Sequence, residues 1–312
     1  MKAASLMRWE TMLAAVLIAG FVVFSILSPY FLSVDTLSDA TFNFTERAIV
    51  ALPLALLIMA ATEIDISVAA IIALASVAMG MASAQGVGTG GLVAIGLGTG
   101  LLAGCVNGAL VAIGRVPSIV ATIGTMTLFR GAAYAVLGDR VLKDYPDSFA
   151  IFGQGYLVGP ISIELALFTL FAILFSVFLH RTRWGRVTFA VGANPVASRY
   201  SGIAVNRYRF ALFALTGLFS GVAAVLLTSR LGSTRPSIPQ GWELEIISMV
   251  ILGGVSVWGG KGSILGVVLA ALVFGLMTFG LGLMNIPGIV LSIFTGLLLI
   301  LVVAVPALVN RR

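Results

Sequence analysis

A few charged and amide side chains interrupt long apolar stretches of this sequence, and their chemistry limits what the chain can do. Asp65 follows one apolar run, Asn107 stands in another, and Thr125 and Arg130 stand in a third. A charge at the centre of a lipid bilayer costs roughly 3 kcal/mol or more unless it finds water or a partner. Such groups therefore mark a polar route, a partner or a helix break. We interpret Asp65, Asn107, Thr125 and Arg130 as candidate residues of a translocation pathway.

The acidic segment around Asp65 has a second interpretation. Glu63 and Asp65 are separated by one isoleucine and followed by Ser67, at the junction between two apolar runs. Asp and Ser are preferred where a helix begins, because their oxygens accept hydrogen bonds from the first-turn amides. For Asn107 and Thr125, hydrogen bonding between helices is the more common role. Helix capping and pathway lining both remain open for the two acids.

Motifs for catalysis and nucleotide binding are missing from the sequence. The glycine-rich stretch 253–263 contains a Gly-Lys pair, but a phosphate-binding loop needs Gly and Ser or Thr where Val255 and Gly262 stand. His180 and Cys105 are the only His and Cys, so a metal site would depend almost wholly on carboxylates. The sequence also offers no nucleophile with an obvious base. We therefore expect no enzymatic activity, no cofactor and no metal site.

The elements that carry these residues are predicted to be membrane helices. Of 312 residues, 60% are hydrophobic and only 10% are charged, whereas soluble domains carry about 25% charged residues. Apolar runs of about 18 residues recur, and in hydrocarbon a helix satisfies its own backbone. The sequence therefore predicts an all-α, polytopic membrane protein with about ten transmembrane helices. The predicted segments are 12–28, 47–62, 67–84, 91–113, 118–137, 161–180, 210–228, 243–257, 263–284 and 288–306.

The distribution of charges predicts how these helices are oriented. Ten crossings return the C-terminus to the side of the N-terminus, and cytoplasmic segments are rich in Lys and Arg. Twelve of the 18 basic residues then lie inside, and nine of the 12 acidic residues lie outside. We expect residues 1–312 to form a single transmembrane domain with both termini in the cytoplasm and an inner loop at about 181–209. The inner basic residues are Lys2, Arg8, Arg115, six arginines within 181–209, Lys261, Arg311 and Arg312.

The first apolar segment resembles a signal peptide, because Lys2 and Arg8 precede it. Its apolar part is long, however, and Pro29-Tyr30-Phe31 offers no small-residue cleavage site. We therefore expect an uncleaved first span.

The inner loop contains six arginines and no acidic residue. The presence of its first arginines, Arg181 and Arg183, is explained by the preference of basic residues for the cytoplasmic side of the membrane. Its middle is different, because Asn194 can cap a short helix with Pro195 at the first helical position. Ser201 and Gly202 then supply a stop. A short helix with a basic rim, projecting from the membrane, is typical of a docking element.

Glycine recurs at every fourth position from Gly96 to Gly108, and Gly217 and Gly221 repeat this spacing. Small residues four apart let helix backbones approach closely. The pattern indicates tight packing within one subunit or, alternatively, a seam between two copies.

Four stretches of the chain carry a resemblance to a known family. They are 63–69, 106–131, the inner loop from Gly185 to Ile203, and 253–266, in that order along most of residues 45–290. In these stretches the chain resembles the membrane permeases of bacterial sugar ABC importers, the group for ribose, xylose and arabinose. One departure is that Thr62-Glu63 replaces the family's usual double glycine before Ile-Asp. This extra acid could pair with a basic group.

The resemblance implies a multi-subunit machine in the bacterial inner membrane. Its expected partners are ATPase subunits, a periplasmic sugar-binding protein, a second permease and membrane lipid, and no nucleic acid. The permease itself neither binds nor hydrolyses ATP, and its two halves are expected to be inverted repeats. In such importers the inner loop contains a short coupling helix that sits in a cleft of the ATPase. The resemblance thus assigns ATPase coupling to Gly192, Asn194, Ala197, Ser201, Gly202 and Ile203.

The cargo and the receptor surface are also expectations from this resemblance. Residues 227–245 look like the rhamnose-type branch, which implies a monosaccharide such as rhamnose or a related sugar. The outer surface around this segment is expected to meet the sugar-binding protein through complementary charges. The residues expected to make this contact are Arg230, Arg235, Glu243 and Glu245.

An ion-coupled secondary sugar carrier is the rival from another class. It needs a functional acid inside the membrane, for which Glu63 or Asp65 would serve. It also predicts uptake without an ATPase partner.

Overall fold

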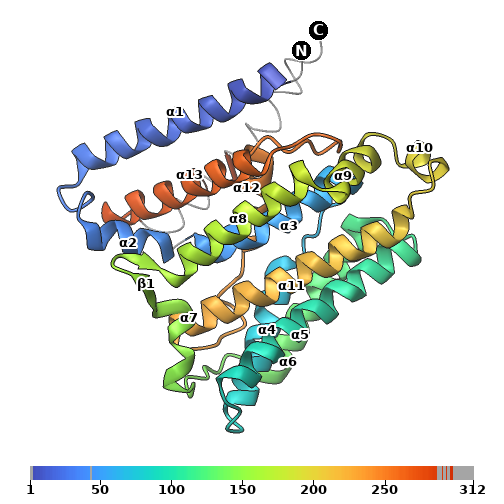
Figure 1. The fold of residues 1–312 in the computed structure, drawn as a ribbon. Coiled ribbons are helices and arrows are strands. Elements are labelled where there is room, and N and C mark those ends of the chain that lie inside the picture. The colour runs from blue at the N-terminus through green and yellow to red at the C-terminus, as the bar shows by residue number, and fades with distance from the viewer. Residues whose placement is uncertain (1–2, 43, 287–289, 291–292, 294–295, 298–312) are drawn as a thin grey trace.

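The computed structural model describes residues 3–42, 44–286, 290, 293, 296 and 297. The axes of its longer helices are roughly aligned, whichever way the chain runs along them (Figure 1). Helices are the expected outcome for these apolar segments, because a helix pairs its backbone amides and carbonyls within one segment. The helices are α1 (Ala3–Leu27), α2 (Val34–Phe42), α3 (Thr45–Ala61), α4 (Val68–Ser83), α5 (Thr89–Gly108), the π-helical turn η1 (Ala109–Ile113), α6 (Ser118–Leu137), the short turn η2 (Asp147–Phe149), α7 (Ile151–Gln154), α8 (Ile163–Arg181), α9 (Arg183–Ala193), α10 (Pro195–Tyr200), α11 (Val205–Leu231), α12 (Trp242–Leu252) and α13 (Ile264–Leu283). A small antiparallel hairpin, β1 (Tyr156–Val158) and β2 (Ile161–Ser162), joins α7 to α8.

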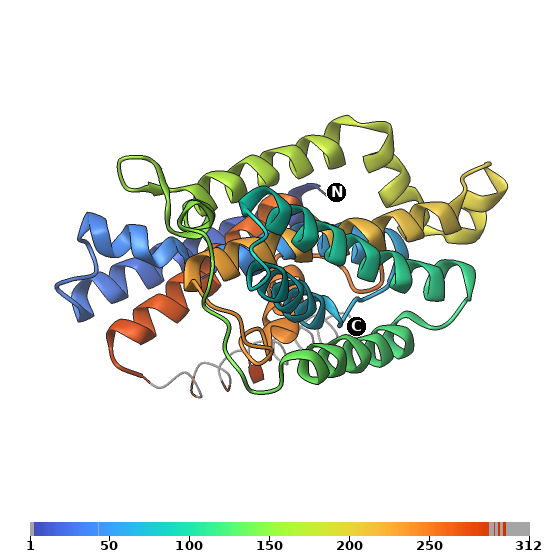
Figure 2. The same cartoon turned by 90° about the horizontal axis from the view of Figure 1, so that it is seen from below.

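The bundle has two ends, which we name the α10 end and the α7 end. In both views α10 projects furthest from one end, whereas α2, α7 and the hairpin lie at the other (Figures 1 and 2). The start of α1 and the loop after α12 lie at the α10 end, where the Trp9 indole N–H donates to the Leu252 carbonyl at 2.8 Å. The Gly260 amide also donates to the Met59 carbonyl at 2.8 Å, which holds that loop against the end of α3.

Six helices among the described residues are long and apolar enough to cross a membrane. A seventh span results if Thr36–Phe42 and α3, bent by 46° relative to each other, are counted as one. The predicted count of about ten is therefore not confirmed. The six spans are Trp9–Leu27, Thr89–Ile113, Ser118–Leu137, Ile163–Arg181, Val205–Leu231 and Ile264–Leu283, and each lies within a few residues of a predicted segment.

Three of the remaining predicted segments are shorter than a spanning helix. Those at 47–62 and 67–84 become α3 and α4, with 17 and 16 residues, whereas about 20 are needed to cross hydrocarbon. The segment at 243–257 shortens to the 11 residues of α12, which ends at Gly253 before Gly254 takes a left-handed φ of +82°. Most of the segment at 288–306 lies outside the described residues.

Helix α3 lies at the centre of the bundle. Nearly all of its residues are buried, and it packs against α8, α9, α11, α12 and α13. Helix α4 is buried along most of its length as well. In the segment 62–67 that joins these two helices, Glu63, Asp65 and Ser67 are buried and Thr62 is exposed. Non-helical backbone is tolerated at membrane depth where it is buried in protein or lines a cavity.

The glycine pattern of the sequence serves packing within the chain. A Cβ added to Gly100 would lie 2.4 Å from the Gly217 carbonyl oxygen, and one added to Gly104 would lie 2.5 Å from the Phe213 carbonyl oxygen. These distances are far below van der Waals contact, so α5 and α11 meet backbone to backbone. Of the two alternatives, tight packing inside one subunit is the one seen for this glycine stripe.

Candidate functional site

A buried polar cluster forms where α3 gives way to α4. The amide and hydroxyl of Ser67 donate to Oδ1 of Asp65 at 2.9 and 2.7 Å. From α5, Nδ2 of Asn107 donates to Oδ2 of Asp65 at 3.1 Å and to Oγ of Ser67 at 2.7 Å. All three side chains are fully buried. The structure thus brings together two of the predicted pathway residues, Asp65 and Asn107, which are 42 positions apart in the chain.

The same geometry shows how Asp65 supports the start of α4. Its carboxylate accepts the amide of Ser67, two residues further on, which is an Asx-turn into the helix. Asn107 lies directly before Gly108 and the π-helical turn η1, and π-turns are frequent at functional positions. Its Oδ1 has no hydrogen-bond partner among the described residues. An amide oxygen buried in this way is available to a polar solute or a water molecule.

Thr125, the third predicted pathway residue, makes only a local contact. Its hydroxyl donates to the Thr122 carbonyl at 3.3 Å. The hydroxyl of Thr122 donates to the Ser118 carbonyl at 2.8 Å and also lies 3.3 Å from the Ile64 carbonyl. Both threonines are buried, but the hydrogen bond of Thr125 stays within α6 and does not join it to Asp65 or Asn107.

Arg130, the fourth predicted pathway residue, is not part of the cluster. Its guanidinium pairs with the Glu243 carboxylate of α12 at 3.3 Å, nearer the α7 end. Two further ion pairs lie at that end: Arg230 with the fully buried Glu46 at 2.7 Å, and Arg47 with Glu245. Three of the four predicted receptor contacts, namely Arg230, Glu243 and Glu245, are therefore engaged inside the chain. Arg235 is exposed and has no ion pair with any described residue.

A second polar cluster, built from hydroxyl groups, was not predicted from the sequence. The Ser76 hydroxyl bonds to those of Thr228 and Thr234, each at 2.8 Å, and the Tyr145 hydroxyl lies 2.6 Å from that of Thr234. Burial raises the pKa of Tyr145 to about 12, so this phenol stays protonated and can donate. Single hydroxyls in apolar segments give no sequence signal, because Ser and Thr also bond to their own helix backbone.

The α10 end carries the predicted docking helix. Oδ1 of Asn194 accepts the amides of Val196 and Ala197 at 3.0 and 2.9 Å, and Pro195 occupies the first helical position. The helix ends at Ser201, and Gly202 follows with φ at +84°. Asn194, Ala197, Ser201 and Gly202 are exposed and Ile203 is half-buried, so five of the six predicted coupling residues lie on or beside α10.

Gly192 differs from the other predicted coupling residues because it is buried. A Cβ there would lie 1.9 Å from the Met59 carbonyl oxygen, so this glycine lets α9 pack on the end of α3. The exposed large apolar side chains of α10 and of the loop after α12 are Val196, Tyr200 and Trp258, which are 60%, 91% and 89% exposed. None of these three side chains was predicted as a contact from the sequence.

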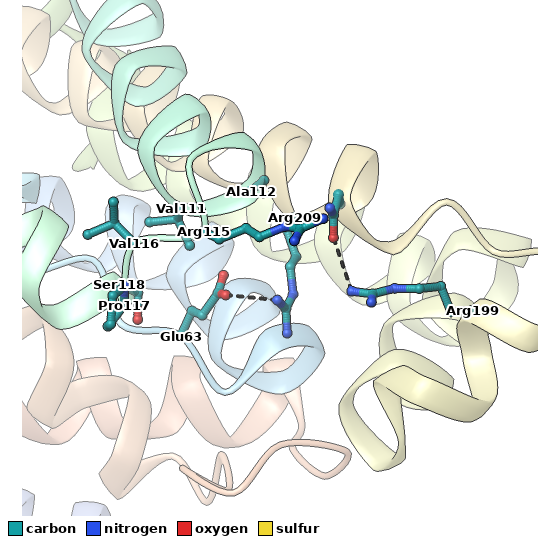
Figure 3. A pocket seen from close by; sticks show the side chains of 10 residues that line it. Glu63, Val111, Ala112, Arg115, Val116, Pro117, Ser118, Arg199 and Arg209 are labelled. Carbon is teal, nitrogen blue, oxygen red and sulfur yellow. Dashed lines mark hydrogen bonds and ion pairs between the residues drawn. The ribbon is translucent and has the colours of Figure 1, made fainter.

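A pocket of about 430 Å³ lies next to α10 (Figure 3). It is lined by residues of four segments: the junction 62–67, η1 with the loop that follows, α10 and the start of α11. Glu63 pairs there with Arg209 of α11 at 3.3 Å, so the acid that departs from the resembled family does meet a basic partner. Arg115 and Arg199 also line the pocket, and Nη2 of Arg199 donates to Oδ1 of Asn206 at 3.2 Å.

Contacts within the chain connect α10 to the buried cluster. Helix α10 leads through Ile203 into α11, and Arg209 in the second turn of α11 holds Glu63. Glu63 lies two residues before Asp65. A displacement of α10 can therefore be transmitted to the Asp65–Asn107 cluster through α11 and the Arg209–Glu63 ion pair. The sequence contained no signal for the Glu63–Arg209 contact, because the two residues belong to segments far apart in the chain.

Eight of the described basic side chains lie at the α10 end, which the topology prediction places in the cytoplasm. The described basic side chains of the α10 end are Arg115, Arg181, Arg183, Arg186, Arg199, Arg207, Arg209 and Lys261. Lys2, Arg311 and Arg312 lie outside the described residues. Among the described residues no group of three His, Cys, Asp or Glu side chains could hold a metal ion.

Comparison with known proteins identifies relatives along almost the whole chain. Residues 36–303 match a protein family described as branched-chain amino acid transport system / permease component. The autoinducer 2 import system permease protein LsrD of Klebsiella pneumoniae subsp. pneumoniae is 36% identical over 303 residues, covering 95% of this chain and 91% of the relative. LsrD of Escherichia coli (strain K12) is 36% identical over 301 residues, covering 95% and 91%. LsrD of Enterobacter sp. (strain 638) is 35% identical over 303 residues, covering 95% and 92%. No solved structure matches this chain.

Proposed function

This chain belongs to the family of permease components of membrane transport systems, and from that premise we propose that it forms the membrane pathway of an ATP-driven importer. As a permease component it is a transport subunit and not an enzyme. The importer needs an ATPase and a solute-binding protein as separate subunits. One observation supports the proposal most directly: a capped, exposed helix, α10, continues through α11 to the acid next to the buried Asp65–Asn107 cluster.

In this proposal α10 is the helix that seats in the ATPase. Its exposed Val196 and Tyr200 supply the apolar contact of a helix that docks in a groove. Such a contact requires the α10 end to face the cytoplasm of a bacterium. The excess of arginines at that end supports this orientation, and with it an inner-membrane location and a cytoplasmic N-terminus.

The α7 end then faces the periplasm and the solute-binding protein. Arg235 is the predicted receptor contact best placed to act, since it is exposed and has no ion pair with any described residue. The internal pairs of Arg230, Glu243 and Glu245 hold the helices that carry this surface. A second permease, identical or related, completes the pathway in this proposal.

The cargo is a small polar solute delivered by that binding protein. The relatives described above are named for import of autoinducer 2, and this makes autoinducer 2 the first solute to test. The comparisons give no support to rhamnose, which serves as the competing candidate. Buried hydrogen-bonding groups such as Oδ1 of Asn107 suit a hydroxyl-rich solute of either kind.

The decisive experiment is uptake by the reconstituted complex of permease, ATPase and binding protein in proteoliposomes. We expect uptake of labelled autoinducer 2 or a sugar that depends on ATP and on all three components. If the purified chain alone accumulated the solute in response to a proton or sodium gradient, the ion-coupled carrier would be correct instead.

A second experiment tests the docking role of α10. The double substitution Val196→Glu and Tyr200→Glu should abolish co-purification of the ATPase and leave membrane insertion intact, because both side chains are exposed. Leu157→Glu, at an exposed site of the α7 end, is the matched control and should retain the ATPase. Gly202→Arg should also uncouple the ATPase, but its φ of +84° adds backbone strain.

A further inference from the structure

The pocket beside α10 has an imbalance of charge that transport does not require. Three arginines, Arg115, Arg199 and Arg209, line it together with one carboxylate, that of Glu63 (Figure 3). Three positive charges and one negative charge leave an excess of two. Because Glu63 pairs with Arg209 at 3.3 Å, the excess falls on Arg115 and Arg199.

Neither of these two arginines is neutralised within the part of the chain that the structure describes. Arg199 donates to the neutral amide oxygen of Asn206 at 3.2 Å, and Arg115 has no ion pair with any described residue. Asn206 lies in the first turn of α11, and that turn has no side-chain cap. The positive end of the α11 dipole therefore adds to the field in the pocket.

We propose that this pocket binds a phosphate-bearing anion between Arg115 and Arg199. Guanidinium groups bind phosphate oxygens with paired, charge-assisted hydrogen bonds, and a volume of about 430 Å³ accommodates such a group. Arg199 belongs to α10, and Arg115 belongs to the loop between η1 and α6. A bound phosphate would thus tie the docking helix to the helices around the Asp65–Asn107 cluster. The phosphate can come from a phospholipid headgroup or from free phosphate in the cytoplasm.

The test measures binding by the purified full-length chain in detergent and has two arms. In the first, the chain is incubated with phosphatidylglycerol or phosphatidylcholine, and bound lipid is counted by native mass spectrometry. In the second, binding of ³²P-labelled inorganic phosphate is measured by equilibrium dialysis. We expect the double variant Arg115→Gln, Arg199→Gln to bind at least about tenfold more weakly than the wild type in one arm, because charge-assisted hydrogen bonds are lost.

A matched control keeps the change in net charge constant. The double variant Arg181→Gln, Arg183→Gln also removes two exposed arginines from the α10 end, but neither of them lines the pocket. It should bind within about twofold of the wild type. An effect confined to phosphatidylglycerol identifies a headgroup as the ligand, and an effect confined to inorganic phosphate identifies free phosphate.

Two results would overturn the proposal: equal binding by all three proteins in both arms, or no binding by the wild type in either arm. The measurement uses the permease chain alone and no transport step, so its outcome is independent of the proposed importer function.

Discussion

At the scale of single residues, the carboxylate of Asp65 shows how a charge is kept inside a bundle of apolar helices. It accepts three hydrogen bonds, two from Ser67 and one from Asn107. Hydrogen bonds to a buried carboxylate offset part of the cost of removing it from water. The cluster is therefore stable only while its donors stay in place, which makes Asn107 the residue to change.

Replacing Asn107 with Leu should destabilise the permease by about 1–3 kcal/mol and reduce uptake severalfold. The substitution keeps the volume but removes the donor to Asp65 and Ser67. Thermal unfolding in detergent and uptake by the reconstituted complex measure the two effects. Thr127→Val on the exposed side of α6 is the control, since its hydroxyl only bonds to its own helix at the Ile123 carbonyl. Equal behaviour of the two variants would remove the assigned role of Asn107.

The Glu63–Arg209 pair should behave as one unit in coupling ATP hydrolysis to uptake. We expect Glu63→Gln and Arg209→Gln each to lower the number of solute molecules imported per ATP hydrolysed. Because both changes break the same 3.3 Å contact, the double variant should be little worse than either single variant, with an interaction energy of about 0.5–3 kcal/mol. Exchange of the two charges, Glu63→Arg with Arg209→Glu, should restore part of the coupling. Strictly additive losses would show that the two residues act separately.

At the scale of elements, the packing of α5 on α11 depends on the absence of side chains between them. Gly100→Ala places a Cβ 2.4 Å from the Gly217 carbonyl oxygen, and we expect a loss of stability of about 1–3 kcal/mol from overpacking. Gly98→Ala in the same helix meets no described atom within 4 Å, and it should leave stability unchanged or raise it slightly. Thermal unfolding of both variants in the same detergent makes the comparison. A neutral Gly100→Ala would mean that the two helices can separate at no cost.

The sequence predicted long helices well and short ones poorly, for a physical reason. An apolar run of about 20 residues or more has few alternatives to a spanning helix, and the six helices that pass this test among the described residues lie close to predicted segments. Helices α3 and α4 are just as apolar, but protein rather than lipid surrounds them. Since burial in protein places no lower limit on helix length, hydropathy alone could not reveal that these segments and α12 fall short of a full span.

At the scale of the whole molecule, the candidate site is assembled from distant parts of the chain, and this limited its prediction. Asp65 and Asn107 were singled out because a charge or amide is unusual in an apolar run. Their contact was not predicted, and neither were the partners of Arg130 and Arg209, which are 113 and 146 positions away along the chain. The sequence indicates that a charged residue within an apolar segment needs a partner, but only the three-dimensional structure identifies that partner.

The orientation of the whole molecule gives a prediction that needs no transport assay. Cys105 is the only cysteine, so Cys105→Ala provides a background for single-cysteine labelling. We expect Leu157→Cys at the α7 end to react with a membrane-impermeant maleimide added to intact cells. Ser201→Cys beside α10 should react only after the membrane is permeabilised, because arginine-rich segments stay in the cytoplasm. The opposite pattern would invert the orientation and remove α10 from contact with the ATPase.

Helix α11 runs for 27 residues without a break, which corresponds to about 40 Å at 1.5 Å per residue, more than the roughly 30 Å thickness of a hydrocarbon core. Its first turns adjoin α10, and near its last turn Arg230 holds Glu46. It contains no proline, and one continuous helix therefore links the α10 end to the α7 end. In the proposed importer, a displacement of α10 by the ATPase would be transmitted along α11, and the Glu46–Arg230 contact is the place at the opposite end where it would alter the structure.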